Sequence, residues 1–141
     1  MGDARHVEIP EDALAFLQQT LTPGILATIG RSGGPVTSAV WYGINGTDLL
    51  VSTPEAGTKA RNVRANARVS FIVDSRERPY RGVAIEGDAA VVEDPSLERW
   101  MAIARRYLGD ELPEEFLQRA RSRPRAIIEI EPKRVRSWNL G

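Results

Sequence analysis

The sequence contains no cysteine and a single histidine, His6, and both shortages restrict its chemistry. Without cysteine there can be no disulfide, no thiolate metal site and no thiol nucleophile. An isolated imidazole near the N-terminus has no second ligand or catalytic partner beside it, so we expect His6 to be solvated. We therefore expect neither a Ser-His-Asp triad nor a bound metal.

Long apolar runs and an excess of charge of one sign are also lacking. No run approaches the roughly 20 apolar residues of a membrane helix, and the first ten residues lack the apolar core of a signal peptide. We therefore expect a soluble, cytoplasmic protein. The 19 basic and 19 acidic residues cancel, which gives no whole-molecule reason for binding nucleic acid or a membrane. Any electrostatic function must come from local segregation of charge.

The remaining sequence is rich in short strand patterns. Hydrophobic residues make up 42% of the 141 residues, which is enough for a core. No linker or internal repeat interrupts the chain, so we expect a single domain, residues 1–141. Apolar and β-branched segments predict six strands, at residues 24–29, 35–44, 48–53, 68–74, 81–93 and 126–130.

Turn signals suggest how these strands connect. The Asn45-Gly46 pair favours a tight hairpin, so we expect the first three strands to form an antiparallel meander. Gly87 is predicted to mark a bulge. Short helices are predicted near residues 10–17, 58–66, 95–108 and 113–121. The expected fold is mainly β (α+β), a small six-stranded antiparallel barrel with peripheral helices.

The segment 56–73 concentrates positive charge, because it contains no acid and four cations, Lys59, Arg61, Arg64 and Arg68. Thr58 is predicted to be the N-cap of a helix, which places Lys59 and Arg61 in the first turn. Cations there oppose the helix dipole, at a cost of a few tenths of a kcal/mol or more, and a bound anion would compensate. The segment thus predicts a phosphate or carboxylate site, and a solvated basic face is the competing interpretation.

Two further segments are candidates for binding a flat ligand. Along the strand from Val36 to Tyr42, Thr37 and Ser38 place a hydroxyl on each face, a polar edge suited to a heterocycle beside Val40 or Trp41. A plain exposed strand is the alternative. The loop that follows the predicted strand 68–74 places Tyr80 among Arg76, Arg78 and Arg81. These side chains could cover a flat ligand or bind its acidic tail, and a solvated loop is equally consistent with the sequence.

Three runs together resemble a known family: ATIGRSGGPVTSAVWY, DLLVSTPEAGTKARNVRANARVSFIVD and VAIEGDAAVVED. They are similar to the pyridoxamine 5'-phosphate oxidase-like split-barrel superfamily, and most similar to its actinobacterial coenzyme F-420-dependent reductases of the B type. The resemblance covers residues 13–93 best, and its most specific part is the block from Lys59 to Asn66. It implies an FMN-binding type of split β-barrel that forms a homodimer, with a cofactor site at the subunit interface.

The resemblance also implies roles for individual residues. Lys59, Arg61 and Asn62, with Thr58, would bind the cofactor phosphate. The deazaflavin ring would be lined by Val36, Thr37, Ser38, Ala39, Val40, Ser52 and Thr53, and Tyr80 would come from the second subunit. No catalytic residue carries over.

The implied function is an oxidoreductase that transfers a hydride from reduced coenzyme F-420 to a conjugated organic substrate, such as a biliverdin, a quinone or a nitroaromatic compound. This chemistry needs proximity and exclusion of water rather than a nucleophile or a metal. An FMN-binding or haem-related split-barrel protein and a non-catalytic F-420 carrier are the alternatives. We expect F-420 to bind more tightly than FMN, because its polyglutamate tail would meet further cations: Arg61, Arg64, Arg76, Arg78 and Arg81.

Overall fold

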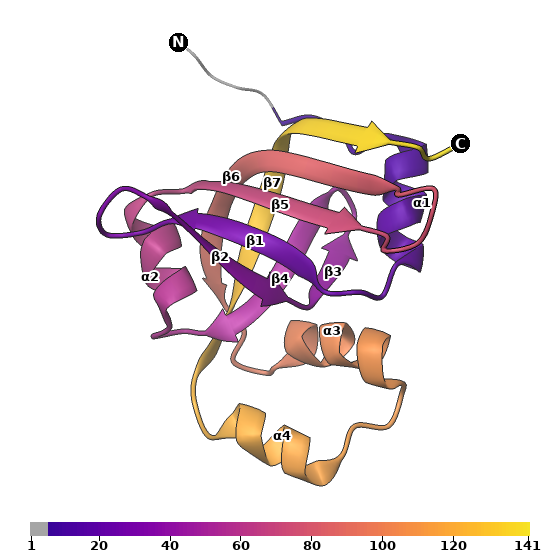
Figure 1. Cartoon of the computed structure of the whole chain (residues 1–141). Helices are drawn as coiled ribbons and strands as arrows, with labels where there is room; N and C mark the ends of the chain where they lie inside the picture. Colours follow the sequence, from indigo (N-terminus) through magenta and orange to yellow (C-terminus); the bar gives the residue numbers. More distant parts are fainter. Residues whose placement is uncertain (1–5) are drawn as a thin grey trace.

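The computed structural model describes residues 6–141 and shows one antiparallel sheet curled into an open barrel (Figure 1). The strands are β1 (Gly24–Ile29), β2 (Pro35–Val40), β3 (Tyr42–Asn45), β4 (Asp48–Pro54), β5 (Arg68–Asp74), β6 (Gly82–Glu93) and β7 (Arg125–Trp138). The helices are α1 (Glu11–Gln19), α2 (Thr58–Ala65), α3 (Glu98–Leu108) and α4 (Glu114–Arg121). No helix within residues 6–141 is long and apolar enough to span a membrane. The split-barrel prediction is confirmed.

The strand count differs from the prediction, because residues 35–44 form two strands instead of one. The sheet order is β2-β1-β5-β6-β7-β4-β3, so β2 and β3 lie at opposite edges. The chain leaves β2, which pairs with β1, passes through Trp41, and enters β3, which pairs with β4. The predicted meander is therefore wrong: Gly46, at φ 64°, does turn β3 into β4, but β2 belongs to a separate hairpin.

The last strand is longer than predicted. Strand β7 continues beyond Ile130 to Trp138, because β6 offers partners along its whole length. The register shifts between Glu86 and Gly87, which confirms the predicted bulge. A Cβ at position 87 would collide with the carbonyl of Glu131, so the close approach of the two strands requires glycine there.

Helix α1 closes one end of the barrel over the buried core. Leu17 and Tyr42 are fully buried, and the Tyr42 hydroxyl lies 2.8 Å from the carbonyl oxygens of both Leu17 and Thr20. The Arg106 guanidinium donates to these two carbonyls and to that of Gln18, over 2.6 to 3.0 Å. Arg106 thereby satisfies the free carbonyls at the C-terminal end of α1 and joins α3 to it. Burial raises the pKa of Tyr42 to about 12, although the nearby Arg106 charge opposes this.

Helices α3 and α4 are inserted between β6 and β7 and lie together at one side of the barrel, the lower side in Figure 1. The buried Asp94 carboxylate accepts backbone N–H bonds from Arg99 and Trp100, which fixes the start of α3. Helix α3 begins at Glu98, later than predicted, and buries Trp100, Ile103 and Ala104. Leu108, the last residue of α3, is exposed.

Candidate functional site

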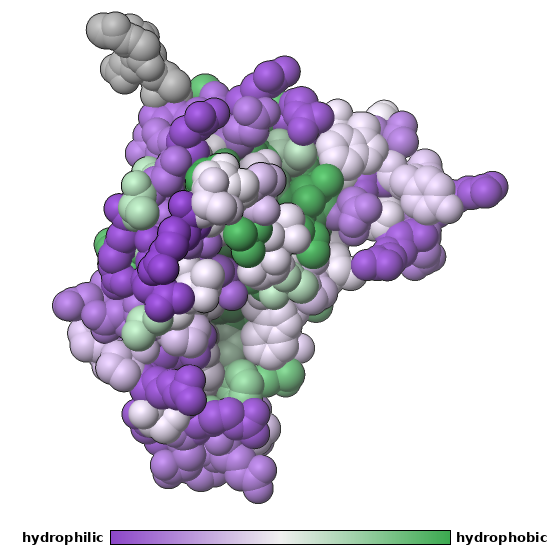
Figure 2. Space-filling view, turned by 60° about the vertical axis from the view of Figure 1, so that its left-hand side comes forward, coloured by the Kyte–Doolittle hydropathy of each residue, from purple (hydrophilic) through white to green (hydrophobic). Residues whose placement is uncertain are grey.

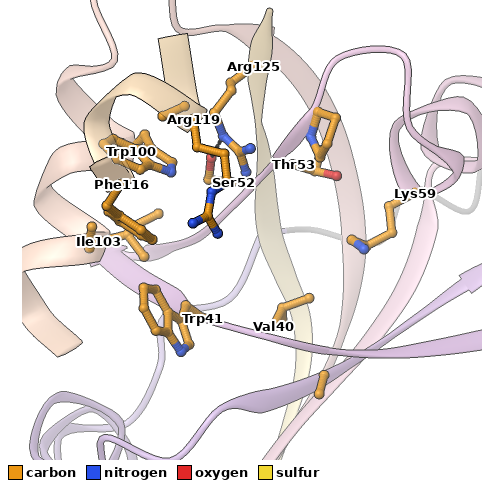
Figure 3. A pocket seen from close by; sticks show the side chains of 14 residues that line it. Val40, Trp41, Ser52, Thr53, Lys59, Trp100, Ile103, Phe116, Arg119 and Arg125 are labelled. Carbon is orange, nitrogen blue, oxygen red and sulfur yellow. Dashed lines mark hydrogen bonds between the residues drawn. The ribbon is translucent and has the colours of Figure 1, made fainter. Parts of the chain in front are cut away.

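A pocket of about 420 Å³ lies between the barrel and the α3–α4 segment (Figure 3). The barrel contributes the end of β2, strand β4 and Trp41, where the chain crosses from β2 to β3 (the Trp41 crossing). The start of α2 contributes Lys59. The helical side contributes residues of α3 and α4. The lining residues are Ala39, Val40, Trp41, Ser52, Thr53, Pro54, Lys59, Trp100, Ile103, Ala104, Phe116, Arg119, Ala120 and Arg125.

One wall of the pocket is aromatic. The rings of Trp100 and Phe116 stack with centroids 5.0 Å apart, and Trp41 lies 6.2 Å from Phe116. Behind this wall, Trp41 stacks on Tyr107 of α3 at 4.8 Å and an interplanar angle of 6°. These contacts hold α3 and α4 against the Trp41 crossing. They present flat apolar surface, which suits a planar conjugated ligand.

The pocket is also cationic, because Lys59, Arg119 and Arg125 line it and no acidic residue among residues 6–141 does. The Arg125 Nε donates to the Ser52 hydroxyl at 3.1 Å. Burial lowers the pKa of Arg125, and the charge of Asp94 partly offsets this. The Lys59 amine and the Arg119 guanidinium make no hydrogen bond or ion pair with any other residue of the described range 6–141. Two unneutralised cations and one partly buried arginine favour an anionic ligand.

Five of the predicted site residues come together in this pocket: Ala39, Val40, Ser52, Thr53 and Lys59. Ala39 and Val40 lie at the end of β2, beside the Trp41 crossing, while Ser52 and Thr53 lie on β4. In Figure 3 the Lys59 amine points toward the pocket from the side opposite α4. The β2, β4 and α2 segments are thus juxtaposed by the closure of the barrel.

The other predicted phosphate ligands on α2 point elsewhere within this chain. Helix α2 begins at Thr58 with Gly57 as its N-cap, so Thr58 is not the N-cap that the sequence predicted. The exposed Thr58 hydroxyl instead accepts from Arg61 Nη2 at 3.2 Å. Asn62 is buried and donates to the Thr28 hydroxyl at 3.0 Å, which attaches α2 to β1 next to the buried Val63. The phosphate-binding roles of these residues stay predictions.

The remaining candidates on β2 lie outside the pocket lining. Strand pairing places Val36 and Ser38 on the same sheet face as the buried Leu26, whereas Thr37 lies on the outer face. The two predicted hydroxyls do therefore occupy opposite faces. Val36 and Thr37 are exposed and Ser38 is half-buried.

The loop between β5 and β6 lies beside α1, at the other end of the barrel from α2 (Figure 1). It contains the exposed Tyr80, and the Arg81 guanidinium lies 5.7 Å from the Phe16 ring of α1. Arg76, Arg78 and Arg81 are therefore separated from Lys59 within one chain. Tyr80 is not among the residues that line the pocket within one chain.

The sequence interpretation missed the helical side of the pocket. Trp100 is buried and also lines the pocket with Phe116. A usable signal was present on α4, where Phe116 and Arg119 are three residues apart and so share a helix face. Nothing local to Arg125 distinguishes it from the other arginines, because its position depends on β7 pairing with β4.

An open barrel whose pocket combines aromatic rings, hydroxyl groups and uncompensated cations has the chemistry to accommodate a planar, anionic small molecule. The sequence agrees with this interpretation. Residues 9–139 match the family described as pyridoxamine 5'-phosphate oxidase, and the chain belongs to this family.

Solved structures show the same fold. Protein Rv2991 of Mycobacterium tuberculosis is 31% identical, with a TM-score of 0.80, and the match covers 99% of this chain and 90% of that one. A protein named an F420 reductase is 29% identical, with a TM-score of 0.78 and coverage of 91% and 98%. The haem storage protein HutZ of Vibrio cholerae, 20% identical over 89% of this chain and 92% of its own, has a TM-score of 0.67 and shows the shared fold alone.

Proposed function

We propose that this protein is a coenzyme F-420-dependent reductase that passes a hydride to a conjugated organic acceptor, such as a biliverdin, a quinone or a nitroaromatic compound. The observation that carries the proposal is the pocket, which combines Lys59 at the start of α2, two arginines and an aromatic wall, and which no acidic residue of the described part of the chain lines. The 29% identity to an F420 reductase over 91% of this chain supports the deazaflavin in particular.

The residues present fit a phosphorylated flavin-like cofactor. The first N–H groups of α2 have no partner within the helix, and together with the Lys59 amine they favour an anion. Ser52 and Thr53 contribute hydroxyls, while Ala39 and Val40 contribute apolar surface on which a ring can lie. A reduced deazaflavin supplies a hydride when bound. The chain itself would orient cofactor and acceptor and exclude water from the space between their reacting atoms. The proton that completes reduction of the acceptor would come from solvent.

The site is proposed to lie at the interface of a homodimer, and the outer face of the barrel supports this. Strand pairing aligns Ala39, Ile25, Ile72 and Ala84 in one row across β2, β1, β5 and β6. Ile25 is 40% exposed and Ile72 36% exposed. Figure 2 shows apolar surface gathered near the middle of one side of the molecule. A second copy would cover this row and would carry its own β5–β6 loop, with Tyr80, toward the pocket.

Titration of the purified protein with F-420 and with FMN tests the cofactor. F-420 should bind more tightly, because its tail of carboxylates adds interactions with exposed arginines such as Arg61 and Arg64, each contributing about 0.2–1 kcal/mol. The preference should shrink with added salt, since exposed charges are screened beyond about 8–10 Å near physiological ionic strength. Equal affinities at low salt, or a preference for FMN, would support the flavin alternative. Tight F-420 binding without reduction of any acceptor would identify a carrier.

A further inference from the structure

Arg119 of α4 lines the helical side of the pocket. We propose that Arg119, together with Arg125, binds a carboxylate of the hydride acceptor, so that the pocket selects planar acceptors that carry an acidic group. This inference rests on the proposed function, because it concerns the second ligand of the same pocket.

The cations of the pocket lie on different sides of it. Lys59 enters from α2, whereas Arg119 and Arg125 come from α4 and from the start of β7 (Figure 3). Val40 and Thr53 line the pocket on the side from which Lys59 enters, and the aromatic wall lies toward α4. If the cofactor phosphate is bound at the start of α2, the two arginines remain for a different anionic group.

Arg119 and Arg125 suit a carboxylate for complementary reasons. Arg125 is already fixed, since it donates to Ser52 and is half-buried. The Arg119 guanidinium makes no ion pair or hydrogen bond within residues 6–141, although it points into the pocket. Guanidinium groups bind carboxylates through paired, charge-assisted hydrogen bonds.

The surroundings of Arg119 determine which part of a ligand can adjoin the bound carboxylate. Phe116 lies one turn earlier on α4 and stacks on the buried Trp100, and Ala120 is buried next to Arg119. A ligand whose acidic group meets Arg119 therefore places its adjoining atoms against aromatic rings. That geometry favours an aromatic or otherwise conjugated carboxylate over a small aliphatic one.

Helix α4 offers a matched control two residues away. Arg121 does not line this pocket, and its Nη1 lies 3.7 Å from Glu114 Oε1 on the same helix. Replacing either arginine with glutamine removes one charge from α4. Only the Arg119 change removes a cation from the pocket.

The test compares two acceptors that differ in charge, 4-nitrobenzoate and its neutral analogue 4-nitrobenzamide. Binding is measured without cofactor, through quenching of the fluorescence of Trp41 and Trp100, both of which line the pocket. Arg119→Gln should weaken 4-nitrobenzoate binding about ten-fold or more, the scale of a lost hydrogen bond to a charged group. It should change 4-nitrobenzamide binding less than two-fold, and Arg121→Gln should leave both unchanged.

Steady-state reduction by reduced F-420 gives the second measurement. Arg119→Gln should raise KM for 4-nitrobenzoate with little change in kcat or in the affinity for F-420. Equal weakening of both probes, or the same effect from Arg121→Gln, would overturn the assignment of Arg119. If wild-type protein binds neither F-420 nor FMN but still prefers 4-nitrobenzoate through Arg119, the proposed function fails and the carboxylate site stands.

Discussion

Lys59 lines the pocket at the start of α2, and its side-chain amine has no hydrogen bond or ion pair to any other residue within 6–141. We expect Lys59→Ala to weaken binding of F-420 and FMN by about 1.5–3 kcal/mol, the scale of a hydrogen bond to a charged group. Fluorescence titration measures this loss. The free energy of unfolding should change little, because the amine supports no other part of the structure.

Arg105→Ala is a suitable control for that experiment. Arg105 lies on α3 outside the pocket lining and donates to the carbonyl of Asp110 at 3.3 Å. This variant should bind both cofactors as wild type does. Unchanged binding by Lys59→Ala would show that no anion is bound at the start of α2.

Tyr42 makes the stability depend on pH in the alkaline range. Burial raises its pKa from 10.0 to about 12. Below pH 10 the hydroxyl keeps its proton in both states, whereas between pH 10 and 12 only the unfolded chain releases it. The free energy of unfolding should therefore fall over this window, by about 2–3 kcal/mol from this group.

Urea unfolding at a series of pH values measures this fall. Tyr42→Phe should be less stable than wild type at pH 8 by about 0.5–1.5 kcal/mol, because one buried hydrogen bond is lost. The difference in free energy of unfolding between wild type and Tyr42→Phe should then narrow as the pH rises from 10 to 12. Tyr80→Phe, which removes an exposed hydroxyl, should show the same dependence of the free energy of unfolding on pH as wild type. A difference between wild type and Tyr42→Phe that stays constant from pH 10 to 12 would contradict the prediction.

Helix α3 depends on one carboxylate outside its own residues. Asp94 Oδ2 accepts from the Trp100 N–H at 3.0 Å, and Oδ1 accepts from the Arg99 N–H at 3.3 Å. Asp94→Ala should lower the free energy of unfolding by about 1–2 kcal/mol, as for other lost helix caps. Chemical denaturation followed by Trp fluorescence tests this.

The same substitution should also disturb the pocket, because α3 carries Trp100 and Asp94 acts electrostatically on Arg125. Weaker acceptor binding by Asp94→Ala is therefore expected. Asp110→Ala removes an exposed carboxylate beyond the end of α3 and should leave stability and binding unchanged. A fully stable Asp94→Ala protein would show that contacts within α3 and α4 fix this segment without the cap.

The outer barrel face gives a prediction for the molecule as a whole. The paired Ile25 and Ile72 leave apolar surface exposed across β1 and β5. Wild-type protein should sediment as a dimer at micromolar concentration, and Ile25→Glu or Ile72→Glu should dissociate it, because association would bury a charge. Leu108→Glu changes an equally exposed leucine on α3 and should leave the dimer intact. A wild-type monomer would contradict the shared-site proposal.

The sequence by itself determined most of the elements and the cationic start of α2. Helix and strand signals are local, so the sequence was sufficient to predict most helices and strands from their periodicity. Pro10 marked the start of α1, and Gly87 marked the bulge in β6. The charge pattern indicated Lys59 and the strand pattern indicated Val40, and the resemblance to a split-barrel family added Ala39, Ser52 and Thr53. The pocket brings these five residues together.

Tertiary structure alone decided how these elements meet. Both halves of residues 35–44 carry strand signals, and only closure of the barrel sends β2 and β3 to opposite edges. The same closure places Trp41 opposite α3 and α4 and creates the aromatic wall. Arg119 and Arg125 reach the pocket through packing between segments far apart in the chain, so their charge was visible in the sequence but their position was not.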